Sequence, residues 1–123
     1  MQVRHQPSSE PAVNLAELLA RVDNDRGLLR DLVVIFKDDF PRQMSVLHRA
    51  IVDSDLKSTE RASHTLKGMF LSLAAARAVA AATRLEQLAR AQDIAALPIA
   101  LKLLENEGAL LLPELEVYLA KIE

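Results

Sequence analysis

The segment from Ser63 to Ala75, SHTLKGMFLSLAA, combines an apolar helical stripe with an unusual polar patch. Its apolar residues recur at spacings of three and four, which predicts an amphipathic helix with one face packed against a core. His64, Lys67 and Gly68 share that spacing and therefore lie along one side of the helix. The segment thus predicts a helical fold together with a candidate site.

The phase of the helix separates His64 from the core. Each helical residue turns by about 100°, so with Ala62 as the reference the apolar residues cluster near about 25° and His64 falls near about 200°. His64 is therefore expected to face water, and Leu71 falls on the same exposed side. The apolar set comprises Ala62, Leu66, Met69, Phe70 and Leu73.

Gly68 and Leu71 suggest that the exposed patch receives a partner. A glycine inside a helix costs roughly 1 kcal/mol relative to alanine, and at an exposed position it gains no packing. A gap beside an imidazole lets a partner's backbone approach the ring, and Leu71 would add an apolar contact. The surrounding charge is mainly basic, which favours an acidic partner, although a solvated face is the plainer interpretation. The charged residues proposed for docking are Lys57, Glu60 and Arg61.

The chemistry available to this patch is narrow. An imidazole is a nucleophile whose nitrogen can hold a transferable phosphoryl group, and Lys67 could offset the charge of that group. Glu60, one turn before His64, is a candidate to hydrogen-bond the ring, with an ordinary surface glutamate as the plainer alternative. The chain contains no Gly-rich phosphate loop and no serine-nucleophile motif, so the rest of the machinery is expected from another protein.

The composition predicts one compact helical domain. The chain has 123 residues, of which 50% are hydrophobic and 3% aromatic, and this balance favours packed helices. A net charge of -2 with mixed signs indicates no nucleic-acid partner, and there are no cysteines. No apolar run approaches the roughly 20 residues that span a bilayer. We therefore expect no membrane insertion and a cytoplasmic protein.

The chain is expected to divide at Asn14. Residues 1–13 carry two prolines and two serines and are predicted to form a flexible leader or linker. Residues 14–123 are predicted to form the helical bundle domain. Asn14 is expected to cap a short helix that lies as a lid on this bundle, and Asp55 to cap the helix that carries His64.

Two prolines lie inside helical patterns, where they are expected to bend or divide the helix. Pro41 lies inside a helical pattern, so we expect a kink or a new helix start near 39–41. The last apolar stripe keeps its phase from Leu97 to Ile122 through Pro113, which predicts one long helix bent near 108–113, with two separate helices as the alternative. The fold class is therefore all-α: an antiparallel up-down-up-down four-helix bundle with an additional N-terminal helix.

The sequence resembles the histidine-containing phosphotransfer (HPt) domain family of multistep two-component signalling. The motif His-x-Leu-Lys-Gly stands at residues 64–68, and Leu85 and Glu86 are similar to a Leu-Glu pair of the family. The resemblance extends over residues 14–122. Further positions that resemble the family are Phe36, Phe40, Pro41, Leu47, Ala50, Asp55, Ala62, Leu73 and Ala75.

The resemblance implies a histidine phosphocarrier without kinase activity of its own. His64 would accept a phosphoryl group from an aspartate of a response-regulator receiver domain and pass it to another receiver. Lys67 would stabilise the charge and Gly68 would give steric access. No cofactor would be bound by this chain, because the receiver brings the magnesium ion. A hybrid sensor histidine kinase is a further partner that the resemblance implies.

The sequence departs from the family pattern at three positions. Met69 and Phe70 replace small residues and are expected to lie towards the core, where they alter packing without blocking His64. Ala74 replaces a glycine and is expected to make the approach of the neighbouring helix harder. None of these changes removes a residue that the transfer needs.

Two other functions remain as alternatives. The chain could be a docking module that binds and sequesters a receiver without becoming phosphorylated. It could also be the dimerisation and phosphoacceptor domain of a histidine kinase. That class follows its histidine with an acidic residue and soon a proline, whereas Thr65, Leu66 and Lys67 follow His64 here. The second alternative is therefore the weaker one.

Overall fold

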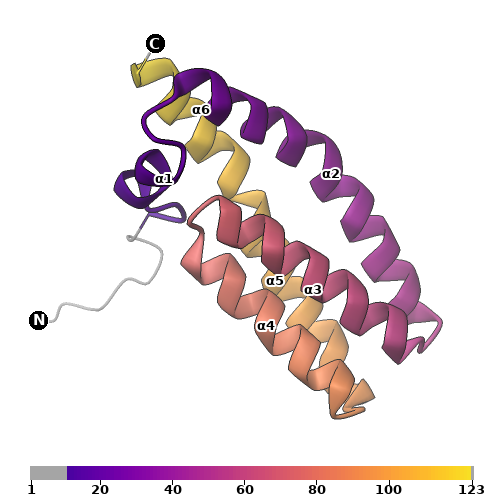
Figure 1. Cartoon of the computed structure of the whole chain (residues 1–123). Helices are drawn as coiled ribbons and strands as arrows, with labels where there is room; N and C mark the ends of the chain where they lie inside the picture. The colour runs from indigo at the N-terminus through magenta and orange to yellow at the C-terminus, as the bar shows by residue number, and fades with distance from the viewer. Residues whose placement is uncertain (1–10, 123) are drawn as a thin grey trace, which may run out of the picture.

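The computed structural model describes residues 11–122, and within that range it contains helices and turns without any strand (Figure 1). The predicted all-α class is confirmed. The predicted leader lies mostly outside the described residues, which begin at Pro11. The helices are α1 (Leu15–Arg21), α2 (Arg26–Val52), α3 (Leu56–Ser72), α4 (Ala76–Arg90), α5 (Leu97–Ala109) and α6 (Leu111–Ile122), with a short 3-10 turn η2 (Ile94–Ala96) before α5.

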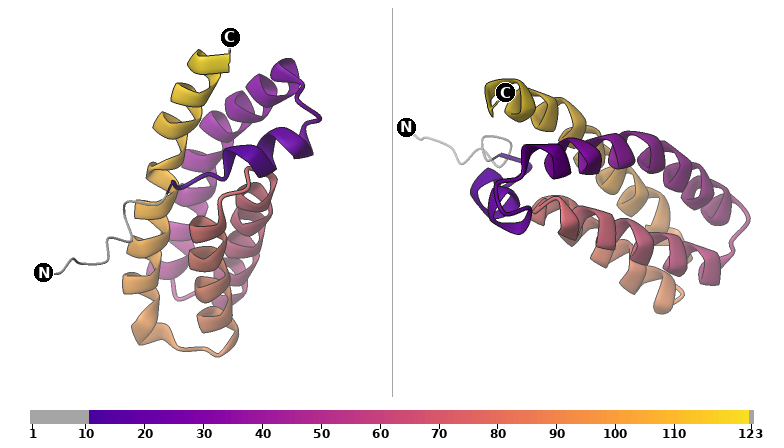
Figure 2. Two further views of the ribbon diagram at one scale, coloured as in Figure 1. Left: turned by 90° about the vertical axis from the view of Figure 1, so that its left-hand side faces the viewer. Right: turned by 45° about the horizontal axis from the view of Figure 1, so that its top comes forward.

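The long helices form an antiparallel bundle, and α1 lies across one end of it (Figures 1 and 2). α3 packs mainly against α2 and α4, whereas α5 packs against α4 and α2. α6 continues from α5 and packs against α2. α3 and α5 therefore occupy diagonally opposite corners, and their outer faces point away from each other.

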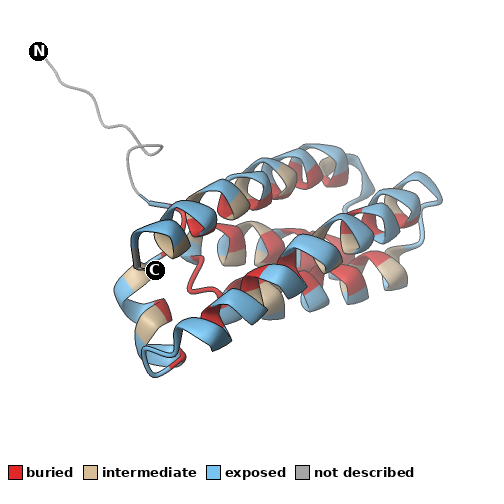
Figure 3. Ribbon diagram, turned by 90° about the horizontal axis from the view of Figure 1, so that it is seen from above, coloured by how far each residue is buried: buried red, intermediate tan, exposed pale blue. Residues whose placement is uncertain are grey.

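The core is mainly aliphatic and contains a cluster of three phenylalanines where α2 meets α3. The rings of Phe36 and Phe40 stack with centroids 5.1 Å apart, and the ring of Phe70 lies 6.4 Å and 6.2 Å from them. Gly108 of α5 faces Phe40 so closely that a Cβ atom there would overlap the ring. Buried positions thus line the inner side of each long helix, as Figure 3 shows. Met69 and Phe70 do lie on the core side of α3, partly and fully buried respectively.

Side-chain caps begin the first three helices. The carboxamide of Asn14 accepts from the amide of Glu17, and the carboxylate of Asp55 accepts from the amide of Ser58. Both caps were predicted from the sequence. A third cap, Asp25, accepts from the amide of Leu28 at the start of α2.

The turns after α2, α3 and α4 have the same backbone conformation at one position. Each has a non-glycine residue in the left-handed region: Ser54 (φ 54), Ala74 (φ 55) and Gln92 (φ 62). In the turn after α3, the amide of Ala75 donates to the carbonyl of Phe70, which is the closure of a Schellman motif. A glycine at position 74 would suit this backbone conformation, and the expectation that Ala74 hinders the approach of the neighbouring helix stays a prediction.

Of the two outcomes expected near Pro41, a new helix start is wrong, because α2 runs without interruption from Arg26 to Val52, and a kink stays a prediction. Pro41 is exposed, so the carbonyl that loses its partner lies where water can reach it. At the other proline, α5 and α6 are separated by a single residue, Leu110, which keeps helical dihedrals (φ -78, ψ -18). The predicted single long helix is therefore wrong and the alternative of two helices is correct, although the apolar stripe keeps its phase through the break.

Residues 12 and 13 pack with the bundle although they were predicted to belong to the leader. Both side chains are buried, and the amides of Ala12 and Val13 donate to the carboxylate of Glu114 at 3.0 Å and 2.6 Å. The amide of Asn14 donates to the carbonyl of Ala74 at 3.0 Å. These bonds attach the start of α1 to both α6 and the turn after α3.

Candidate functional site

His64 stands on the outer face of α3, in the middle of the helix. Its side chain is 68% exposed, as the helical phase predicted. The preceding residue, Ser63, is buried and donates its hydroxyl to the carbonyl of Thr59, whereas the following residue, Thr65, is exposed, so the surface of α3 turns from core to water at His64. The Asp55 cap fixes where α3 begins.

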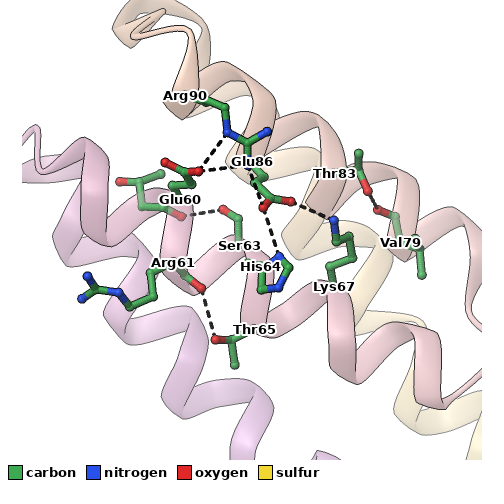
Figure 4. A network of polar contacts seen from close by, with 11 residues as sticks. Glu60, Arg61, Ser63, His64, Thr65, Lys67, Val79, Thr83, Glu86 and Arg90 are labelled. Atoms are coloured by element: carbon green, nitrogen blue, oxygen red, sulfur yellow. Dashed lines mark hydrogen bonds and ion pairs between the residues drawn. The ribbon is translucent and has the colours of Figure 1, made fainter.

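Glu86 of α4 holds one side of the imidazole ring (Figure 4). Its Oε2 atom lies 3.1 Å from Nδ1 of His64, and its side chain is only 7% exposed. An ionised carboxylate can only accept a hydrogen bond, so this contact places the proton on Nδ1. Nε2 of His64 then keeps its lone pair.

Two cations also bind the same carboxylate. Lys67 Nζ donates to Oε1 of Glu86 at 2.9 Å, and Arg90 donates to Oε2 at 3.1 Å. Arg90 also donates to Glu60 at 2.9 Å. Glu60 is therefore engaged with α4, and the hypothesis that it orients the ring of His64 is wrong because Glu86 occupies that role.

The charges around Glu86 determine its ionisation. Burial opposes the charged form, but the hydrogen bond and charge of Lys67, followed by the hydrogen bond of His64, outweigh burial and hold the pKa of Glu86 below its usual value. Glu86 is thus an anion under neutral conditions. Removing one partner of such a buried pair is costly, because the remaining charge loses its compensation.

Gly68 leaves an open space next to the histidine. A Cβ atom built at Gly68 would meet no other atom within 4 Å. Leu71, three residues further along α3, is 45% exposed. Between α2 and α3, close to this end of the patch, lies a mainly apolar cleft of about 90 Å³ lined by Leu32, Ile35, Phe36, Met69, Ser72 and Leu73.

The basic residues predicted for docking are exposed on the other side of His64. Lys57 and Arg61 line an open depression of about 420 Å³ together with Glu60, His64, Thr65 and Glu86. The structure therefore brings together His64, Lys67 and the basic residues on α3. Their roles in transfer and docking stay predictions.

Glu86 is the site residue that the sequence analysis did not assign. Its signal was the pair Leu85 and Glu86, in which a carboxylate directly follows an apolar core residue and is itself buried. Because Glu86 lies 22 positions from His64, its contact depends on how α3 and α4 pack in register. Helical periodicity within either segment carries no such information.

Comparison with known families matches residues 31–122 to the family model described as Hpt domain. The match begins inside α2, includes the whole of α3 and α4, and ends with α6, so it covers most of the chain. Searches among curated proteins and among solved structures found no match. In the described residues, no helix is both long and apolar enough to cross a membrane.

Proposed function

The chain belongs to the Hpt domain family, and from that premise we propose that it is a phosphocarrier in which His64 accepts a phosphoryl group from a receiver aspartate and relays it to another receiver. Hpt domains act in histidine phosphotransfer of two-component signalling. The single observation that best supports His64 is its exposed ring held through Nδ1 by a buried carboxylate. In His48, by contrast, it is Nε2 that lies 3.4 Å from Oε2 of Glu105, and His48 has no neighbouring glycine.

The proposed step needs no proton transfer on this chain. The lone pair of Nε2 attacks the phosphorus of the receiver's acyl phosphate, the N–P bond forms, and the bond from phosphorus to the aspartate oxygen breaks with its electron pair. The ring, which keeps its Nδ1 proton, becomes cationic. Glu86 is placed to stabilise this charge through its 3.1 Å contact with Nδ1. The same step in reverse delivers the phosphoryl group to the next receiver.

Lys67 would act through charge. Lys67 lies one turn along α3 from His64, and its ammonium group donates a hydrogen bond to Glu86. From this position it can offset the negative charge that the phosphoryl group brings. We infer that the magnesium ion comes with the receiver and that this chain has no kinase activity of its own. A hybrid sensor histidine kinase as donor and a cytoplasmic location also remain parts of this proposal.

Docking would use the surface on either side of His64. Gly68 admits the receiver's backbone, Leu71 offers an apolar contact, and Lys57 and Arg61 offer positive charge towards the acidic pocket of a receiver. The apolar cleft between α2 and α3 would extend the contact beyond Leu71.

The test is transfer of labelled phosphate from a phosphorylated receiver domain in the presence of magnesium. We expect acid-labile label on the wild type and on His48→Gln, and none on His64→Gln, with unchanged helix content in both variants. Label that persists on His64→Gln would refute the assignment. If several receivers bind the wild type but none labels it, the chain is the non-phosphorylated docking module instead.

A further inference from the structure

A second apolar face runs along the outside of α5 and α6. Its members recur at spacings of four, three, four, three and four residues, which is the heptad pattern of a helix that packs against another helix. All of them are exposed, and no described residue of the chain covers them. This seam, about 27 Å long at 1.5 Å per residue, consists of Ile99, Leu103, Asn106, Leu110, Pro113 and Val117.

The seam carries a row of large apolar side chains on a face that is open to water. Its four large apolar side chains are between 47% and 72% exposed, while the inner face of the same helices is already buried in the core. The helical dihedrals of Leu110 keep the seam in phase across the break between α5 and α6. Single exposed apolar residues are ordinary, but an aligned row of them indicates a contact surface.

The charges along the seam are self-complementary. Lys102 and Glu116 flank one edge, and neither forms an ion pair within the described residues. The other edge carries Glu107 and Glu114, which are engaged by Arg77 and by the amides of Ala12 and Val13, and it ends at Lys121, which also forms no ion pair there. In a two-fold pair of antiparallel helices, Glu116 lies opposite the partner's Lys102. In a parallel pair it lies opposite the partner's Lys121. Either orientation therefore places opposite charges together.

We propose that two copies of this chain associate through the seam on α5 and α6, as a two-helix coiled-coil contact. Because α3 and α5 occupy diagonal corners of the bundle and His64 is exposed on the outer face of α3, the contact leaves both copies of His64 facing outward. The dimer would present two phosphotransfer sites at once. The seam offers few large side chains, so the association is reversible and depends on protein concentration.

Sedimentation velocity over a concentration series tests the association. We expect the wild type to shift from monomer to dimer as its concentration rises from about 1 µM to several hundred micromolar. Leu103→Glu should keep the protein monomeric throughout, whereas Val34→Glu, which changes an equally exposed residue on α2, should behave as the wild type. A wild type that stays monomeric, or a dimer unaffected by Leu103→Glu, would overturn the proposal.

Charge exchange tests the pairing itself. Glu116→Lys should weaken the dimer at least tenfold, and a second change, either Lys102→Glu or Lys121→Glu, should restore it. If neither second change restores the dimer, the self-complementary arrangement of charges is refuted.

Cross-linking locates the contact, because the chain has no native cysteine. In an antiparallel pair, oxidised Ile99→Cys should link to Val117→Cys, and in a parallel pair Ile99→Cys should link to itself. Dimers that form neither link would place the contact elsewhere and contradict the proposal.

Phosphotransfer separates this proposal from the function of His64. Leu103→Glu should accept label from a receiver at the wild-type rate, because the seam lies on the far side of the bundle. A monomeric protein whose Leu103→Glu variant loses receiver binding would assign the seam to the receiver and refute self-association. His64→Gln should dimerise normally, so failure of the phosphocarrier function would leave the dimer test intact.

Discussion

Gly68→Ala should make the protein more stable and at the same time a poorer phosphotransfer partner. The added methyl group meets no atom of the chain within 4 Å, so it costs nothing in packing. Alanine is favoured over glycine inside a helix by about 1 kcal/mol, and α3 has no other feature at this position that would cancel the gain. We expect the midpoint of thermal unfolding to rise by about 4 °C.

The functional effect has the opposite sign. The space that the methyl group fills lies one turn from His64, where the receiver must approach for in-line transfer at Nε2. A receiver displaced by the width of a methyl group loses part of its contacts. We expect the rate of transfer at subsaturating receiver to fall by about tenfold, which corresponds to about 1.4 kcal/mol of lost interaction.

The other two glycines provide matched controls. Gly108→Ala should destabilise the protein by about 1–3 kcal/mol, because its Cβ atom would overlap the ring of Phe40. Gly27→Ala, near the start of α2, brings its Cβ atom 3.3 Å from the capping carboxylate of Asp25 and should change both stability and transfer little. Thermal unfolding and receiver-to-protein transfer are measured on all three variants.

Two results would refute this reasoning. A loss of stability in Gly68→Ala would show that the space beside His64 is not open. A gain in stability with the wild-type transfer rate would show that the space is not needed by the receiver.

Three further predictions concern the site and the turns. Because the folded-state pKa of Glu86 is lowered, its ionised form stabilises the fold at pH values above the usual pKa of 4.5, and this contribution is lost as the pH falls through the lowered pKa. In urea unfolding across the acid range, the free energy of unfolding should therefore decline less for Glu86→Gln than for the wild type. Leu71→Glu should weaken receiver binding, measured by calorimetry, without unfolding α3, and unchanged affinity would remove Leu71 from the docking surface. Ser54→Gly and Gln92→Gly should each raise the free energy of unfolding by up to about 1 kcal/mol, since both residues hold a positive φ, whereas Ala74→Gly should gain less because the buried methyl group is lost.

The sequence was sufficient for features that depend on local periodicity and capping. The exposure of His64 followed from its phase against Leu66 and Phe70, and the caps at Asn14 and Asp55 followed from residue type and position. The bundle itself followed from four amphipathic segments joined by short turns. Each of these inferences used residues that are close in the chain.

The features that were missed depend on contacts between distant segments. Gly108 is small because Phe40 of α2 lies against it, and Glu114 binds the amides of residues 12 and 13, more than 100 positions away. Neither partner can be identified from the periodicity of one helix. The new helix start at Pro41 was wrong for a related reason: Pro41 is exposed, so the carbonyl that it deprives of a partner lies where water can reach it.

The contact between His64 and Glu86 shows why the site depends on the bundle as a whole. His64 is on α3 and its orienting carboxylate is on α4, so the 3.1 Å contact exists only while the two helices keep their register. Lys67 adds a second link between the same helices through the other oxygen of Glu86, at 2.9 Å. The tautomer of the exposed ring is therefore set by packing between α3 and α4, and a core substitution that shifts these helices should impair transfer even though His64 remains in place.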